Sequence, residues 1–148
     1  LNIVLDEQPD IVGHNLETVE RLTPSVRSKA TYRNSMGVLQ EIARRRIITK
    51  TGIMVGLGEK QDEVITLLHE AYDAGCRMIT IGQYLQPSEK QLDVQEYVHP
   101  DVFALYKKEA LRIGFDNAES GPLVRSSYMA EQSFISMLIH KKKKAQVV

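Results

Sequence analysis

The sequence predicts an α/β protein made of successive βα units. Short runs rich in β-branched residues alternate with amphipathic stretches of helical spacing, and the runs end in glycine or polar residues. The chain of 148 residues can bury the core of one domain, whereas a complete eight-stranded barrel typically needs about 250 residues. We therefore predict part of a TIM-like (β/α) barrel with parallel strands, followed by a C-terminal helical extension.

The predicted elements follow one another without a linker, a repeat or a second domain. The expected strands span residues 10–13, 47–55 and 78–81, and the expected helices span residues 16–22, 33–45, 64–74, 101–113 and a last stretch that ends near 140. Residues 85–99 are expected to form a loop, and residues 119–122 a turn.

Turn and cap residues set these boundaries. The strand at 47–55 has the most β-branched residues and ends at Gly56. Apolar residues then recur from Val64 to Tyr72 at helical spacing, and Gly75 ends that helix. Pro24 is expected to limit the helix at 16–22.

The composition excludes several classes of function. Lys plus Arg and Asp plus Glu both number 19, so no net charge favours nucleic acid or an anionic membrane as a partner. No apolar run reaches the roughly 18 residues of a membrane span. The single cysteine, Cys76, cannot form an internal disulfide, which indicates an intracellular protein. Leu1 is interpreted as an internal start, and Lys141–Lys144 as a solvated tail.

Three predicted strand ends carry residues that could bind a ligand, because ligands of parallel β/α folds lie at the C-terminal ends of strands. Gly56 and Gly58 allow close backbone approach, but neither a dinucleotide fingerprint nor a P-loop is present. A tight turn and a ligand site are equally supported there. Asn15 and Glu17 are typical of a helix N-terminus, and contacts to a ribose or an amino-acid group are the alternative.

The remaining polar candidates are less specific. Lys50 lies within an apolar strand, where its ammonium either reaches water or meets an anion inside the barrel. Cys76 is expected to be a small buried residue. Ser126 and Ser127 are suited to cap the last helix. The four histidines show no metal-ligand spacing.

Four motifs together carry a resemblance to a known family. In chain order they are His14–Val19, Lys50–Glu59, Gly82–Pro87 and Gly121–Ala130. Over about residues 10 to 130, the chain resembles the lipoyl synthase family of radical S-adenosylmethionine enzymes. Each motif alone is weak, whereas four in the family's order are specific.

The resemblance implies a fold and an activity. The fold is the C-terminal half of a radical S-adenosylmethionine partial barrel, with residues 1–130 in the barrel and residues 131–148 as a terminal helix and basic tail. The activity is insertion of two sulfur atoms at carbons 6 and 8 of a protein-bound octanoyl chain, which makes the lipoyl cofactor. One [4Fe–4S] cluster cleaves S-adenosylmethionine to a deoxyadenosyl radical, and a second, auxiliary [4Fe–4S] cluster donates the sulfur.

The resemblance also implies site residues. It assigns contacts to S-adenosylmethionine to Asn15, Glu17, Gly52, Met54, Gly56, Glu59, Gln83 and Tyr84. Met54 replaces an isoleucine of the family and keeps an apolar wall for adenine. Ser126 is the expected ligand of the auxiliary cluster, with Ser127 as the alternative, and Arg125 is expected to hold the serine loop near that cluster.

The chain departs from the family in its cysteines. It has neither the C-x3-C-x2-C motif nor the C-x4-C-x5-C motif, and a cluster needs several thiolate ligands. The isolated chain is therefore predicted to be inactive and to be a fragment of a longer enzyme. The alternative is a non-catalytic half-barrel that serves as a binding or interaction module.

The resemblance finally implies partners and a location. The expected partners are octanoylated lipoyl domains or the glycine-cleavage H protein, together with an electron donor protein, and neither nucleic acid nor a membrane. The expected location is the bacterial cytoplasm, and an organelle stays open as an alternative.

Overall fold

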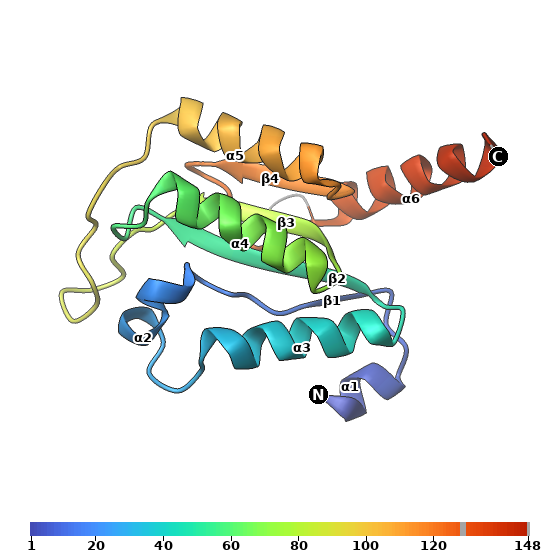
Figure 1. The fold of residues 1–148 in the computed structure, drawn as a ribbon, viewed down its shortest axis with the longest axis horizontal. Helices are drawn as coiled ribbons and strands as arrows, with labels where there is room; N and C mark the ends of the chain where they lie inside the picture. Colours follow the sequence, from blue (N-terminus) through green and yellow to red (C-terminus); the bar gives the residue numbers. More distant parts are fainter. Residues whose placement is uncertain (128–129, 148) are drawn as a thin grey trace.

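The computed structural model describes residues 1–127 and 130–147 (Figure 1). Helices and strands alternate along the chain, as the sequence predicts. In order they are α1 (Asn2–Asp6), β1 (Ile11–Gly13), the 3-10 helix η1 (Glu20–Leu22), α2 (Thr23–Val26), α3 (Tyr32–Arg44), β2 (Ile48–Val55), α4 (Gln61–Asp73), β3 (Cys76–Gln83), α5 (Pro100–Ile113), β4 (Asn117–Gly121) and α6 (Ala130–Gln146).

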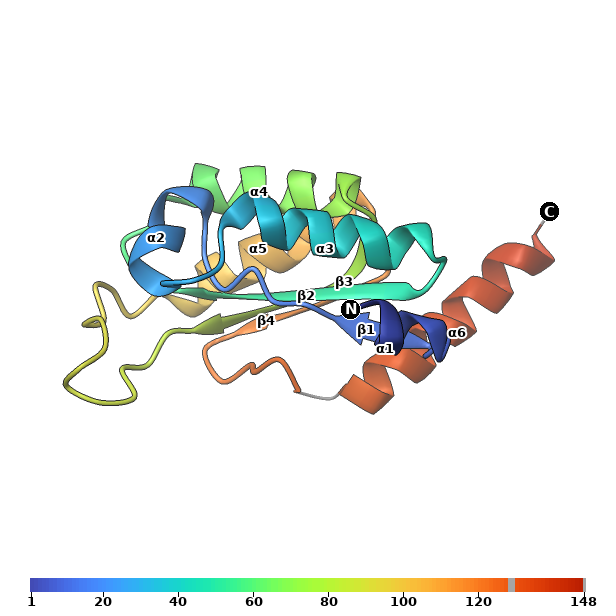
Figure 2. The same ribbon diagram turned by 90° about the horizontal axis from the view of Figure 1, so that it is seen from below.

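The four strands form one parallel sheet whose spatial order β1-β2-β3-β4 follows the chain. Helices α3, α4 and α5 all cover the same face of this sheet, whereas α6 begins on the other side and extends outward past the end of the sheet (Figure 2). Neighbouring strands in chain order with every crossover helix on one face are the arrangement of a (β/α) barrel wall. The predicted α/β fold class is confirmed.

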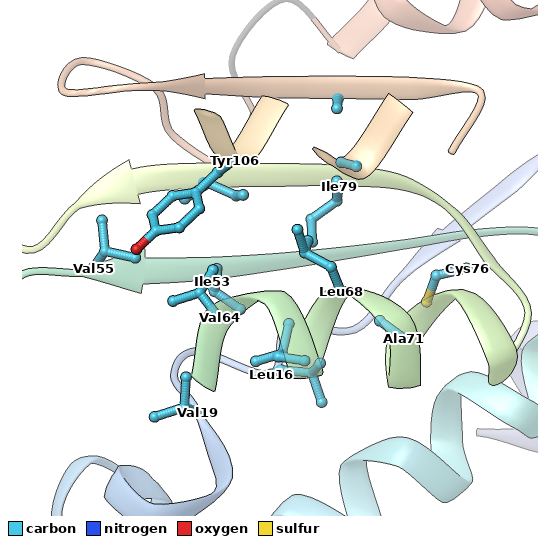
Figure 3. Packing of buried hydrophobic residues seen from close by; sticks show 14 of the residues in the cluster. Leu16, Val19, Ile53, Val55, Val64, Leu68, Ala71, Cys76, Ile79 and Tyr106 are labelled. Atoms are coloured by element: carbon cyan, nitrogen blue, oxygen red, sulfur yellow. The ribbon is translucent and has the colours of Figure 1, made fainter. Parts of the chain in front are cut away.

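The hydrophobic core lies between the sheet and its helices. Alternate residues of β2, including Ile53 and Val55, point into it together with Ile79 and Ile81 of β3. Helix α4 contributes Leu68 from the side facing the strands (Figure 3). This packing holds the C-terminal ends of the strands at one edge, where the predicted site residues lie.

The opposite face of the sheet is polar and rich in glycine. The alternate residues of β2 on this face are Lys50, Gly52 and Met54, and the register places Thr80 beside Gly52 and Gly82 beside Met54. Parallel sheets normally have both faces covered. In a barrel, this face would line the interior.

Two predicted local structures are wrong. No helix spans residues 16–22, because Glu17 pairs with Ile53 at the edge of β2, and only η1 and α2 follow. Pro24 lies in the first turn of α2, where its missing N–H costs nothing. Residues 119–122 do not form a turn, because residues 117–121 pair with β3 as strand β4.

The last helix is longer than predicted. Helix α6 extends to Gln146, so the lysine run lies within the helix rather than in a tail after it. Lysine is a good helix former, and exposed lysines need no packing partner. Tyr128 and Met129 of the last motif lie outside the described residues. Across residues 1–127 and 130–147, no helix has the length and hydropathy to cross a bilayer.

Candidate functional site

A cavity of about 190 Å³ opens on the glycine-rich face, at the C-terminal ends of the strands. Its walls come from the segment after β1, from β2 and β3, and from the segment after β4. The lining residues are Asn15, Glu17, Gly52, Ile53, Met54, Thr80, Gly82, Gln83, Leu85, Val124, Arg125 and Ser126. Five predicted site residues meet here from three of the four motifs, and Arg125 and Ser126 join them from the last.

Asn15 and Thr80 converge over Gly52 in the floor of the cavity. A Cβ atom on Gly52 would lie 2.8 Å from the Thr80 hydroxyl oxygen and 2.9 Å from the Asn15 Oδ1. Glycine is therefore required at this position if both polar groups are to keep their places. The arrangement leaves a backbone surface with two polar side chains directly above it.

Glu17 is fixed to the sheet by its main chain. Its N–H donates to the Gly52 carbonyl at 3.1 Å, and its carbonyl accepts from the Met54 N–H at 2.8 Å. The φ angle of Glu17 is 70°, in the left-handed region that a glutamate rarely adopts. The N-cap interpretation of Asn15 and Glu17 is wrong, because the main chain here pairs with β2 instead of starting a helix.

Glu59 closes the turn after β2 instead of facing the cavity. Its carboxylate accepts hydrogen bonds from the N–H groups of Gly56 at 2.7 Å and Leu57 at 2.9 Å. Gly56 has a φ of 99°, and a Cβ there would lie 2.4 Å from the Glu96 carbonyl. Gly56 and Glu59 both lie outside the cavity lining, and they shape the turn that supports it.

Gln83 and Tyr84 hold the 85–99 loop. The Gln83 amide donates to the carbonyls of Tyr84 and Glu96 and accepts from the Val98 N–H at 2.9 Å. The Tyr84 hydroxyl donates to the Leu92 carbonyl at 2.7 Å. Gln83 borders the cavity with its polar atoms already bonded, and Tyr84 does not border it.

The segment that follows β4 crosses the open face of the sheet. Its Val124 carbonyl rests against Gly82, where an added Cβ would lie 2.2 Å from that oxygen. Arg125 donates to the Val124 carbonyl at 2.7 Å. Ser126 and Ser127 are both exposed, and Ser126 lines the cavity, whereas Ser127 does not.

A second depression of about 500 Å³ adjoins the first and shares Asn15, Glu17 and Ser126 with it. Its other lining residues are Gly13, His14, Arg27 and Lys50. Burial, followed by the nearby Arg27 guanidinium, lowers the pKa of His14. Burial also lowers the pKa of Lys50. The second depression by itself lies within the range of about 300–1,000 Å³ that is typical of ligand pockets.

Cys76 lies away from both depressions. It is fully buried in the core beneath α4 (Figure 3), and burial raises the pKa of its thiol to about 12. A buried neutral thiol is a poor metal ligand. Within residues 1–127 and 130–147, no group of three or more His, Cys, Asp or Glu side chains could hold a metal ion.

Comparison with known proteins gives one consistent result. Lipoyl synthases of Parabacteroides distasonis and Caldicellulosiruptor bescii are 54% and 53% identical to the chain, over 87% and 88% of its length. That of Treponema denticola is 48% identical over 92% of the chain. The chain is similar to lipoyl synthases along most of its own length. The predicted resemblance is thereby confirmed, although no family model matches.

The similarity covers only part of the lipoyl synthases. The matched region makes up 46%, 47% and 45% of the proteins from P. distasonis, T. denticola and C. bescii. The chain thus spans about half the length of the lipoyl synthases it matches.

Sequence reasoning missed five residues of the cavity, which are Ile53, Thr80, Gly82, Leu85 and Val124. Thr80 lies in an apolar strand, and its alternation with Ile79 and Ile81 was the available signal that it faces away from the core. Leu85 and Val124 lie in irregular segments, where no periodicity indicates which way a side chain points.

Proposed function

We propose that this chain forms about half of a lipoyl synthase, the half that follows the cluster cysteines. The observation that carries the proposal is the cavity in which Asn15, Glu17 and Gly52 lie beside Ser126, although these motifs are far apart in the sequence. The roughly 50% identity to lipoyl synthases supports it. We place residues 1–130 in the barrel and residues 131–148 in the C-terminal helical extension, whose lysine run lies within α6.

The cavity fits part of S-adenosylmethionine. The bare backbone of Gly52 and the side chain of Met54 would accept the adenine, and Asn15 and Glu17 would bind the ribose or the methionine group. The carboxylate of Glu17 can accept from the ammonium or hydroxyl groups of that molecule. Bound S-adenosylmethionine supplies the deoxyadenosyl radical that removes hydrogen from the octanoyl chain.

Within this proposal, the protein groups have distinct tasks. Asn15 and Glu17 orient the cosubstrate, and Gly56 and Glu59 keep the turn beneath it in shape. Gln83 and Tyr84 hold the 85–99 loop beside the cavity. Holding reactants in a fixed geometry is the main contribution that such side chains make to a rate.

The chain cannot hold an iron–sulfur cluster with its own residues. Its single thiol is buried on the helix side of the sheet, and Ser126 in the cavity is the proposed ligand. The thiolate ligands of both clusters are proposed to lie outside these 148 residues. Octanoylated lipoyl domains or the glycine-cleavage H protein, and an electron donor protein, are the proposed partners.

The test is substitution of Ser126 by alanine in the full-length protein that carries this chain. We expect Ser126→Ala to retain reductive cleavage of S-adenosylmethionine and to lose lipoyl product by at least about 100-fold, because only the second cluster is affected. Deoxyadenosine and lipoylated peptide are measured by mass spectrometry in the same reaction.

Ser127→Ala is the matched control and is expected to keep both products. Normal lipoyl yield from Ser126→Ala would remove Ser126 as a ligand. Loss of product in Ser127→Ala alone would show that Ser127 rather than Ser126 is the ligand, and it would still agree with the proposed activity.

A further inference from the structure

A lysine on the open face of the sheet contacts the segment that carries Ser126. Lys50 lies near the start of β2, beside Gly13 of β1 and Met78 of β3. Its ammonium donates a hydrogen bond to the main-chain carbonyl of Ser126, 76 residues further along the chain. This contact joins a rigid strand of the sheet to an irregular segment that crosses it.

Among residues 1–127 and 130–147, Lys50 has no carboxylate partner that explains its position. The ion pairs in the described part of the chain all join other residues. Its side chain is half-buried and spans the second depression to reach the Ser126 carbonyl. An ammonium loses hydration in such a place, and a hydrogen bond to a carbonyl offsets part of that cost.

The anchor at Ser126 complements a second one two residues earlier. The Val124 carbonyl packs on Gly82 of β3, and the Val124 N–H donates to the Gly121 carbonyl at 3.2 Å. Between these anchors, Arg125 donates to main-chain carbonyls of its own segment, those of Val124 and Pro122. Lys50 is thus the side chain from the sheet that holds the main chain at Ser126.

We propose that Lys50 is a positioning residue that fixes the main chain at Ser126 and thereby directs the Ser126 side chain into the cavity. Because the contact is made to the carbonyl, the hydroxyl of Ser126 stays available for a ligand. The anchor itself follows from the contact with Lys50. Its consequence for the reaction rests on the proposed function, in which Ser126 binds the auxiliary cluster.

The experiment uses three variants of the full-length protein, with its clusters, that carries this chain. Lys50→Met removes the ammonium and keeps the length of the side chain, Lys50→Arg keeps a donor, and Lys107→Met is the control on the exposed side of α5. Trypsin cleaves after arginine, so cleavage of the folded protein between Arg125 and Ser126 reports how firmly this segment is held.

We expect cleavage after Arg125 to be about fivefold faster in Lys50→Met, because loss of one hydrogen bond of ordinary strength changes the population of the open segment by about this factor. Lys50→Arg is expected to restore the rate to within about twofold, and Lys107→Met to leave it unchanged. The ratio of lipoyl product to deoxyadenosine should fall in Lys50→Met and recover in Lys50→Arg, while the melting temperature of all three variants stays near that of the natural protein.

The outcomes separate this inference from the proposed function. An unchanged cleavage rate in Lys50→Met overturns the anchor, whatever the Ser126→Ala variant does. A higher KM for S-adenosylmethionine with an unchanged cleavage rate would also overturn it, because Lys50 would then bind the cosubstrate instead. Faster cleavage in Lys50→Met, combined with normal lipoyl yield in Ser126→Ala, supports the anchor and rejects the ligand role of Ser126.

Discussion

Single residues determine the shape of the candidate site through their size and their bonds. Gly52 leaves room for two side chains, and Gly82 leaves room for a carbonyl of the crossing segment. Glu59 and Gln83 were predicted to bind a ligand. In the structure, their polar side-chain atoms form hydrogen bonds with the main chain of the surrounding loops. The walls of the cavity therefore depend on residues that need not touch a ligand.

Gly52 gives the sharpest prediction at this scale. Gly52→Ala places a Cβ 2.8 Å from the Thr80 hydroxyl oxygen and 2.9 Å from the Asn15 Oδ1, so at least one of these side chains must move. We expect the Kd of S-adenosylmethionine to rise by about tenfold or more, which corresponds to about 1.4 kcal/mol. Isothermal titration calorimetry on the full-length protein measures it.

Gly37 in the middle of α3 is the matched control for this substitution. A Cβ at Gly37 meets no atom within 4 Å. Gly37→Ala is expected to leave the Kd unchanged and to raise the free energy of unfolding by about 0.5–1 kcal/mol, because alanine favours helix. Equal affinities of Gly52→Ala and the natural protein would show that the cosubstrate does not rest on Gly52.

Residue patterns predicted the site better where side chains alternate than where the chain is irregular. The glycine motif at 52–58 lies at a strand end as expected, because β2 has a strong β-branched pattern. The role of Gln83 could not be predicted, because its three partners lie in a loop that no periodicity describes. Long-range contacts such as that of Lys50 with Ser126 are likewise invisible in a sequence.

At the scale of elements, strands were predicted where local propensity agrees with the sheet. β4 was missed, because Asn117, Glu119 and Gly121 are poor strand formers and only pairing with β3 makes them extended. The segment after β1 was predicted as a helix on the strength of Asn15, yet pairing with β2 determines its conformation. In both places tertiary contacts override local preference.

The N-terminus of α4 carries a prediction of its own. Glu63 accepts from the Lys60 N–H at 2.7 Å and pairs with Arg21 at 2.7 Å, which joins α4 to η1. Its hydrogen bond from Arg21, followed by that from the Lys60 main chain, lowers the pKa of Glu63 to about 2. A carboxyl with a lowered pKa stabilises the fold above its unfolded pKa of 4.5 and loses this effect as the pH falls towards 2.

Glu63→Gln is therefore expected to reduce the free energy of unfolding at pH 7 by less than about 1 kcal/mol, since the pair is largely solvated. The difference from the natural protein should shrink as the pH falls from 4.5 to 2. Urea unfolding at a series of pH values measures it. Glu131→Gln is a control in the first turn of α6. A difference that grew on acidification would contradict the assigned bonds.

At the scale of the whole molecule, one face of the sheet is packed and the other is open. β1 and β4 are the two edges of the sheet, and each pairs with one neighbour among the described residues. Large apolar side chains are exposed at several places, including Ile3, Tyr97 and Leu123. Unpaired strand edges and exposed apolar surface promote association between chains.

We therefore expect the polypeptide of residues 1–148, produced alone, to associate with itself in a concentration-dependent manner, since its β1 and β4 edges can pair with other copies. It should also bind the dye ANS, because large apolar side chains such as Ile3, Tyr97 and Leu123 reach solvent. Analytical ultracentrifugation over a range of concentrations measures the first effect and fluorescence the second. The full-length protein is the control, in which further segments are expected to cover these edges. A monomeric 148-residue polypeptide without dye binding would contradict this expectation and favour a half-barrel that is stable by itself.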